Sequence, residues 1–197
     1  MNLTRIGIII FMIAALTGPM YTVEGYSSVR NVISELGAQN TPYSWIMILG
    51  FLALGLGIIA GCIQAFNKSI IPFILFGLFM ALAGFFPHKP VNPDIEYNKF
   101  LHQAHSMLAT LAGISISVGL LWRAVLATST FGRIIPLILG VLCFALPMSM
   151  IAFPDYQGLI QRIMYLLIFI WLWKNIPLKN TADNTRPSTP SRYEPDD

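Results

Sequence analysis

Six long apolar runs constrain this chain more than any other feature of its sequence. They cover residues 6–21, 43–66, 70–86, 101–122, 134–153 and 157–176. The hydrocarbon core of a bilayer is about 30 Å thick, and an α-helix needs about 20 apolar residues to cross it. The sequence therefore predicts an all-α, polytopic membrane protein, in which residues 1–176 form one domain, a bundle of six transmembrane helices.

The composition agrees with lipid as the solvent for most of the surface. Charged residues make up 11% of the 197 residues, whereas soluble domains carry about 25%. The 12 basic residues outnumber the 9 acidic ones, but they stand singly between apolar runs, which argues against binding to nucleic acid. Cys62 and Cys143 lie inside apolar runs without a CxxC pattern, which predicts a packing role and excludes a disulfide framework or zinc ribbon.

The segments between the runs predict how the helices are connected. Short connections at residues 67–69 and 124–133 favour antiparallel neighbours in a compact bundle. Gly57 and Gly61 have the GxxxG spacing that lets two helix backbones approach closely in a membrane. A cleaved signal peptide is the alternative for the first run, although no small-residue cleavage site follows it. Residues 177–197 are rich in Pro, Ser, Thr and charge, which predicts a disordered cytoplasmic tail.

The distribution of basic residues predicts the orientation. With six spans both termini lie on one side of the membrane, and eight of the 12 basic residues fall there: Arg5, Lys68, Arg123, Arg133, Lys174, Lys179, Arg186 and Arg192. The positive-inside rule makes this side cytoplasmic, in a plasma or inner cell membrane. His88, His102 and His105 then belong to the outer half, so we expect any site to face outward.

Arg162 is the strongest single indication of a site. It lies twelve residues before Lys174, which at about 1.5 Å per residue places it about 18 Å from the inner boundary. A guanidinium inside the membrane is expensive unless it is paired or reaches a water-filled cavity, so an acidic partner is expected. The candidates are Glu35, Asp155 and Glu24. The alternative is that the long side chain extends to the outer interface.

The histidines at the start of the fourth run form a second candidate site. His102 and His105 are three residues apart, a spacing that suits two ligands of one metal ion such as zinc. A catalytic zinc needs a third ligand, which would come from Asp94, His88, Asp155 or Glu35. Such a metal, or His102 as a general base, could hydrolyse a lipid ester, amide or phosphate, with His102, His105 and Asp155 as catalytic residues. Ligand binding without metal, or a structural role in capping the helix, are the alternatives.

The segment after the first run has the pattern of a short amphipathic helix. Val29, Val32, Ile33 and Leu36 recur at helical spacing, and Gly37 is placed to end the helix. We expect this helix to lie on the outer surface, either covering a cavity or serving only as a connector.

Several stretches of the chain resemble the domain of unknown function 998 family of prokaryotic integral membrane proteins. They read NVISELGAQNTP at residues 31–42, FFPHKP at 85–90 with LHQAH at 101–105, and FPDYQGLIQR at 153–162. The resemblance covers about residues 6–175 and implies a multi-helix membrane domain. It implies that the polar landmarks of the family are Ser34, Glu35, Gly37, Pro87, His102, Asp155, Gln161 and Arg162. It implies no mechanism, because the biochemical activity of the family is not established.

These observations predict an outward-facing polar pocket that binds a small anionic or lipidic ligand. The binding residues would be Ser34, Glu35, Gln161 and Arg162, since the planar fork of an arginine suits a carboxylate or phosphate. The alternative is a membrane scaffold, an accessory protein or a transporter, although the path below Arg162 holds few polar residues. The lipid bilayer is the predicted partner, and the sequence leaves the oligomeric state open.

Overall fold

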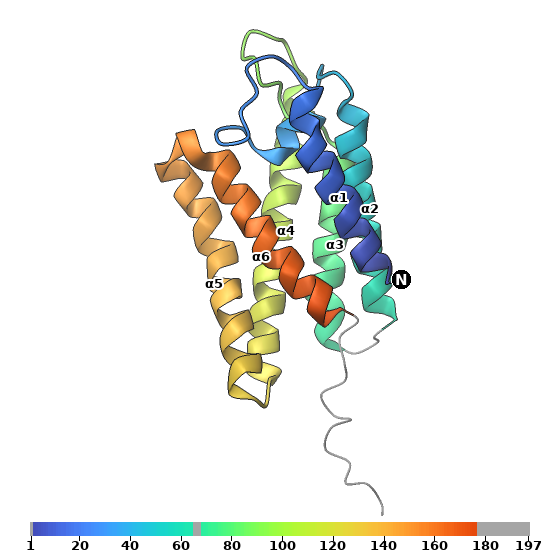
Figure 1. Ribbon diagram of the computed structural model, residues 1–197, viewed down its shortest axis with the longest axis vertical. Helices are drawn as coiled ribbons and strands as arrows, with labels where there is room; N and C mark the ends of the chain where they lie inside the picture. Colours follow the sequence, from blue (N-terminus) through green and yellow to red (C-terminus); the bar gives the residue numbers. More distant parts are fainter. Residues whose placement is uncertain (1, 65–67, 177–197) are drawn as a thin grey trace, which may run out of the picture.

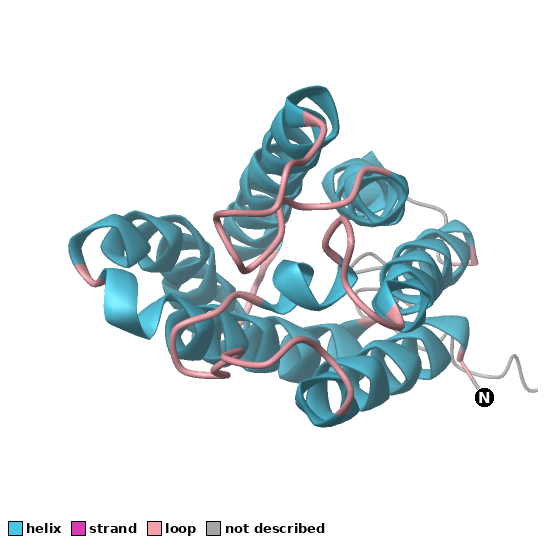
Figure 2. Cartoon of the chain, turned by 90° about the horizontal axis from the view of Figure 1, so that it is seen from above, coloured by secondary structure: helices cyan, strands magenta, loops and turns pink. Residues whose placement is uncertain are grey.

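The structure is a computed structural model, which describes residues 2–64 and 68–176, and all regular elements in these ranges are helices (Figures 1 and 2). The α-helices are α1 Leu3–Thr17, α2 Ser44–Ile63, α3 Ile71–Phe85, α4 Lys99–Leu126, α5 Thr130–Ala152 and α6 Gln157–Asn175. Four 3-10 helices are η1 Gly18–Met20, η2 Ile33–Gly37, η3 Lys68–Ile70 and η4 Pro154–Tyr156. The all-α prediction is confirmed, and each predicted apolar run overlaps one α-helix, although α1, α4 and α5 begin before their predicted runs and α4 also ends after its run. The predicted tail, 177–197, lies outside the described residues.

The helices have the length and surface of a membrane protein. Five helical segments are long and apolar enough to cross a membrane: Leu3–Met20, Ser44–Ile63, Lys99–Leu126, Thr130–Ala152 and Pro154–Asn175. α3 is also apolar but has only 15 residues. On α5, large apolar side chains such as Phe144 and Ile151 are 64% and 75% exposed, and an apolar surface of this extent indicates contact with lipid. The chain therefore has the character of a membrane protein.

The bundle has two ends of different construction (Figure 1). The long segments 18–43 and 86–98 and the α5–α6 turn lie at one end, which we call the loop end. The first residues of α1 and the last of α6 lie at the opposite end, the terminal end. There the Asn2 side-chain amide donates a hydrogen bond to the Ile176 carbonyl oxygen at 2.6 Å, and the Arg5 guanidinium donates to the Trp173 carbonyl at 3.1 Å. α6 thus runs obliquely, from α5 at the loop end to α1 at the terminal end.

The first two helices pack backbone to backbone, as the GxxxG spacing predicted. A Cβ on Gly57 would lie only 2.6 Å from the Leu3 carbonyl oxygen, and a Cβ on Gly61 would collide with the Thr4 hydroxyl. The absence of a side chain at both glycines lets Thr4 donate a hydrogen bond to the Gly57 carbonyl at 2.9 Å. Close approach of this kind strengthens dispersion contacts where lipid provides no hydrophobic driving force.

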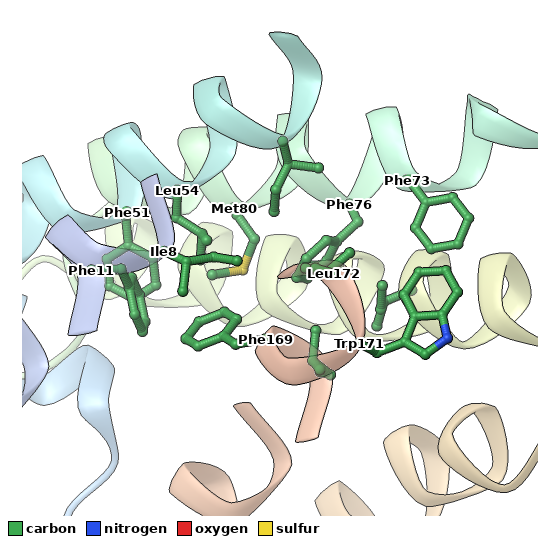
Figure 3. Close-up of a cluster of buried hydrophobic side chains, with 14 of the residues drawn as sticks. Ile8, Phe11, Phe51, Leu54, Phe73, Phe76, Met80, Phe169, Trp171 and Leu172 are labelled. Atoms are coloured by element: carbon green, nitrogen blue, oxygen red, sulfur yellow. The ribbon is translucent and has the colours of Figure 1, made fainter. Parts of the chain in front are cut away.

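Aromatic side chains join α6 to the rest of the bundle (Figure 3). Phe11 of α1 meets Phe51 of α2 and Phe169 of α6 edge to face, each with ring centroids 5.4 Å apart. Nearer the terminal end, Phe73 of α3 stacks on Trp171 of α6 at 5.3 Å. Such ring pairs stabilise a core beyond the area that they bury.

The structure contains the short helix predicted after the first run only in part, and the helix ends at Gly37 as expected. Only Ile33–Gly37 is helical, as the 3-10 helix η2, and Ile33 and Leu36 are each 3% exposed. These two side chains are three residues apart, so they share one face of a 3-10 helix and are buried in the bundle. The preceding residues 28–31 are not part of the helix, and their carbonyl oxygens are hydrogen bonded to α6.

Candidate functional site

The Arg162 side chain is held at the loop end by the segment that precedes η2. One guanidinium nitrogen donates to the carbonyl oxygens of Ser28 at 2.7 Å and Asn31 at 3.0 Å. It also donates to the Gly158 carbonyl of its own helix at 3.1 Å, and the other terminal nitrogen donates to the Tyr26 hydroxyl at 2.7 Å. We call this arrangement of Tyr26, residues 28–33 and the first turns of α6 the α6 clamp.

The acidic partner expected for Arg162 is not among these contacts. Within residues 2–64 and 68–176, no carboxylate forms an ion pair with its guanidinium; all its partners are carbonyl or hydroxyl oxygens. Hydrogen bonds from an ionised donor are stronger than those between neutral groups, so several of them satisfy a half-buried guanidinium without a counter-charge. In this structure Arg162 therefore binds the protein's own loop.

Two further residues of the same turn complete the α6 clamp. The Gln161 side-chain oxygen accepts a hydrogen bond from the Ile33 backbone N–H at 2.6 Å, which fixes the start of η2. The Gly158 N–H donates to the Arg30 carbonyl at 3.3 Å, and a Cβ on Gly158 would collide with the carbonyl oxygens of Asn31 and Ser28. In the stretch Gly-x-x-Gln-Arg, the glycine thus lets the loop backbone approach α6 closely. The glutamine and arginine side chains form hydrogen bonds to the same loop.

Glu35 is a half-buried residue of η2. Its carboxylate accepts a hydrogen bond from the Val32 N–H at 2.9 Å, three residues earlier, and so caps η2. Burial raises the pKa of Glu35 above its ordinary value; the Asn31 side chain, the Val32 N–H and the charges of Lys89 and Arg162 oppose this rise. Glu35 thus acts on Arg162 through its electrostatic field, without direct contact.

His105 holds the end of α3. Its Nδ1 lies 2.7 Å from the Phe86 carbonyl oxygen and 3.0 Å from that of Ala83. Because a carbonyl only accepts, Nδ1 carries the proton. The carbonyls at the end of a helix have no partner within the helix, so the 4% exposed His105 supplies a donor that they need.

His88 and His102 complete a cluster of three histidines at the loop end. The His88 ring centroid lies 4.5 Å from that of His102 and 5.4 Å from that of His105. The His102 Nδ1 accepts from the Lys89 N–H at 3.4 Å, and the His88 Nδ1 lies 3.0 Å from the Lys89 carbonyl. Burial lowers the pKa of His88 to about 3; electrostatic interactions with His105, His102 and Lys89 add to this effect, and the hydrogen bond to the Lys89 carbonyl opposes it. His88 is therefore a neutral imidazole at physiological pH.

The other predicted site residues do not join this cluster into a metal site. In the described part of the chain, no group of three or more His, Cys, Asp or Glu side chains is arranged to hold a metal ion. Asp155 is exposed in η4 at the α5–α6 turn and has no contact with the histidines. Ser34 is 7% exposed, and its hydroxyl forms no hydrogen bond to any described residue.

Gln39 and Tyr26 are polar residues of the loop end that sequence reasoning missed. The Gln39 side chain donates to the carbonyls of Pro87 at 3.2 Å and Asn98 at 3.1 Å, and accepts from the Asn98 N–H at 2.8 Å. Its own N–H donates to the His88 carbonyl at 2.9 Å, so Gln39 joins the two long loops. The sequence offered one indication of Gln39, since it lies in the stretch 31–42 that resembles the family.

A cavity of about 390 Å³ lies between the helices just below the loop end. We call it the lateral cavity; α3, α4, α5 and α6 form its walls. Its lining is mostly apolar and thioether: Phe76, Met80, Ala109, Ala112, Gly113, Ile114, Ile116, Cys143, Phe144, Pro147, Met148, Met150, Met164 and Ile168, with Thr110, Gln161 and Tyr165 as polar members. Gln161 belongs both to this lining and to the α6 clamp, so the cavity begins where the clamp ends.

A family model described as "Protein of unknown function (DUF998)" matches residues 5–173, nearly the whole helical bundle. The chain belongs to the DUF998 family. This confirms the resemblance that the sequence stretches indicated. Neither the curated proteins nor the solved structures contain a significant match to the chain. The part that matches DUF998 contains the α6 clamp, the histidine cluster and every residue of the lateral cavity.

Proposed function

We propose that this DUF998 protein holds a lipidic ligand in the lateral cavity, without hydrolysing it, under a cap formed by the loops of the loop end. The single observation that carries this proposal is the cavity itself, about 390 Å³ between membrane helices with a mainly apolar and methionine-rich lining. A volume of this size accommodates part of an acyl chain, and flexible thioether side chains adapt to chains of different shape.

The chemistry of the lining favours a lipidic ligand over a small anion. Arg162, the cation that motivated an anionic ligand, already donates to four oxygen atoms of the protein. No Lys or Arg side chain lines the cavity. A free carboxylate or phosphate would therefore enter an apolar space without a counter-charge, which is unfavourable.

The positions of the candidate catalytic residues favour binding over hydrolysis. His102, His105 and Asp155 do not line the lateral cavity. The Nδ1 atoms of His88 and His105 lie against backbone carbonyls, and His105 in this way holds the end of α3.

We further propose that all six helices span a cell membrane, with both termini in the cytoplasm. η3 precedes α3 without a break and lengthens this short helix toward the terminal end. Both termini of the bundle lie at the terminal end, where Arg5, Arg123, Arg133 and Lys174 are found. The positive-inside rule assigns such an end to the cytoplasm.

Photocrosslinking with a phosphatidylcholine that carries a diazirine on one acyl chain tests the lipidic ligand. The full-length protein is illuminated in a membrane, and modified residues are mapped by peptide mass spectrometry. Adducts are expected on Met80 and Met164 inside the cavity, and also on lipid-facing Ile138. The variant Gly113→Phe should lower the Met80 and Met164 adducts about tenfold, because a Cβ at Gly113 meets no atom within 4 Å and the ring can fill the cavity.

Two controls make this experiment decisive. Gly113→Ala leaves most of the cavity open and should retain the adducts at Met80 and Met164. Adducts at Ile138, which is 52% exposed, should not change in either variant. Adducts confined to lipid-facing residues in the wild-type protein would contradict the proposal.

A purely structural membrane scaffold is the second candidate function. It is favoured by the α6 clamp, in which the Gln161 and Arg162 side chains bind only other parts of the chain. A scaffold predicts that Arg162 variants reduce the amount of folded protein, and that Gly113→Phe alters neither lipid adducts nor association with partners.

A further inference from the structure

A second pocket lies at the terminal end, on the opposite half of the bundle from the loop-end cap. It has a volume of about 570 Å³ and is bounded by the end of α4, the α4–α5 turn, the start of α5 and the end of α6. We call it the terminal pocket. Its apolar wall is formed by Phe131, Ile135, Leu139, Leu167, Ile170 and Trp171. It shares no lining residue with the lateral cavity, so conclusions about it do not rest on the proposed function.

Two cationic side chains line the terminal pocket and have no partner in the described part of the chain. Arg123 is half-buried near the end of α4, and Lys174 is exposed in the last turn of α6. Neither forms a hydrogen bond or ion pair with any described residue. A half-buried guanidinium that lacks a partner loses hydration without compensation, so this arrangement favours an external anion.

The described residues provide no acid to neutralise these cations. All their Asp and Glu residues lie at the loop end: Glu24, Glu35, Asp94, Glu96 and Asp155. None of them lines the terminal pocket. The terminal end therefore carries a positive potential that nothing in residues 2–64 and 68–176 offsets, in contrast to the loop end.

Neighbouring residues place the two cations at the depth of lipid headgroups. Trp122 and Trp173 adjoin Arg123 and Lys174 in sequence, and they are 52% and 38% exposed. Exposed tryptophans at helix ends are typical of the membrane interface. The first turn of the 23-residue helix α5 also forms part of the wall, through Phe131 and Gly132, and the positive end of its dipole adds to the attraction for an anion.

We propose that the terminal pocket binds a phospholipid with an anionic headgroup, taken from the surrounding bilayer. The headgroup phosphate lies between Arg123 and Lys174, and one acyl chain packs against the apolar wall of α5 and α6. Cations at the rim of an apolar groove complement both parts of such a molecule, and a zwitterionic headgroup gains less because its own ammonium group opposes the attraction.

Native mass spectrometry of the full-length, delipidated protein in neutral detergent tests this proposal. Phosphatidylglycerol and phosphatidylcholine with identical acyl chains are the probes. Wild-type protein should bind phosphatidylglycerol at least tenfold more tightly. Arg123→Gln and Lys174→Gln should each weaken phosphatidylglycerol binding about fivefold or more, the loss expected when one cation near a headgroup is removed, and should weaken phosphatidylcholine binding less.

Arg133→Gln is the matched control, because Arg133 is an exposed cation at the same end that does not line the pocket. It should change phosphatidylglycerol binding less than twofold. Equal affinity for the two lipids, or an equal loss in Arg133→Gln, would overturn the proposal in favour of unspecific surface attraction. Displacement of the lipid by millimolar inorganic phosphate would also overturn it, since a lipid site gains from its apolar wall.

A second control tests whether the occupant of the terminal pocket is a lipid or the chain's own acidic residues beyond position 176. Asp183→Asn, Glu194→Gln, Asp196→Asn and Asp197→Asn together remove these carboxylates from the full chain. If a lipid occupies the pocket, this variant binds phosphatidylglycerol as the wild type does. A gain of more than fivefold, with no lipid preference in the wild type, would identify the chain's own acidic segment as the occupant and overturn the proposal.

Discussion

Arg162 and Arg123 are both half-buried arginines on helices of one bundle, yet their surroundings are opposite. At the loop end, Arg162 donates to three carbonyl oxygens and one hydroxyl. At the terminal end, Arg123 has no hydrogen-bonding or ionic partner among the described residues and borders a pocket of about 570 Å³. A half-buried arginine in a membrane protein therefore indicates a binding partner. Only its surroundings reveal whether that partner is the chain itself or an external molecule.

The largest effect is expected from removing the cation of the α6 clamp. Arg162→Met leaves the carbonyls of Ser28 and Asn31 and the Tyr26 hydroxyl without their charged donor. Since hydrogen bonds to a charged group contribute about 1.5–3 kcal/mol each and are not additive, the free energy of unfolding should fall by about 3 kcal/mol. The melting temperature in detergent measures this loss. Arg30→Gln is the control, because that exposed side chain has no described contact; equal melting temperatures for the two variants would contradict the clamp.

A smaller loss is expected from closing the gap that Gly158 leaves for the loop. In Gly158→Ala the new methyl group collides with the carbonyl oxygens of Asn31 and Ser28, and overpacking of this kind costs about 1–3 kcal/mol. Gly113→Ala is the matched helix glycine, since a Cβ there meets no atom within 4 Å. Thermal unfolding should show a loss for Gly158→Ala and none for Gly113→Ala. A tolerated Gly158→Ala would mean that the loop does not dock as closely as described.

The histidine cluster should make the cap sensitive to acid. Burial lowers the pKa of His88 to about 3 from its ordinary 6.5. The unfolded chain therefore takes up a proton below about pH 6.5 that the folded protein does not bind, and the stability falls as the pH drops from about 6.5 toward 3, by at most about 1.4 kcal/mol per pH unit. Melting temperatures measured from pH 8 to pH 4 should fall less steeply for His88→Gln than for the wild type. Parallel curves would exclude His88 as the cause.

The smallest effect is expected at the terminal end. Arg123→Gln removes a cation that has no described partner, so the free energy of unfolding in detergent without anionic lipid should change by less than about 0.5 kcal/mol, as at ordinary surface sites. The melting temperature measures this difference. A loss as large as that of Arg162→Met would mean that Arg123 is bound within the protein, and the contrast between the two ends would disappear.

The sequence was sufficient for the secondary structure because the hydrophobic signal is local and long. The six apolar runs each overlap one α-helix, and the glycines of the GxxxG spacing lie where two backbones meet. It failed for residues 28–32, which are not helical although apolar residues recur there at helical spacing; the backbone carbonyls of residues 28–31 are instead bound by α6. A contact between segments more than 120 residues apart leaves no trace in the local pattern.

The candidate site was predicted in part. The sequence singled out Glu35, Gln161 and Arg162, and all three lie in or beside one hydrogen-bonded arrangement at the loop end. It named an acid as the partner of Arg162, because charge rules favour ion pairs in the membrane, whereas the structure supplies backbone carbonyls. Asp155 and the histidines were expected to converge, and the fold places Asp155 apart, at an exposed turn.

The sequence by itself determined the helices, the membrane character and which polar residues are unusual, because hydrophobicity and charge act residue by residue. Only the tertiary structure decided how those polar residues are used, since hydrogen-bond partners and cavities depend on which segments meet. The docking of residues 28–33 on α6 occupies Arg162, and the gaps between α5 and α6 create a lateral cavity and a terminal pocket. Neither gap corresponds to any motif, because a space between three or four helices belongs to none of them alone.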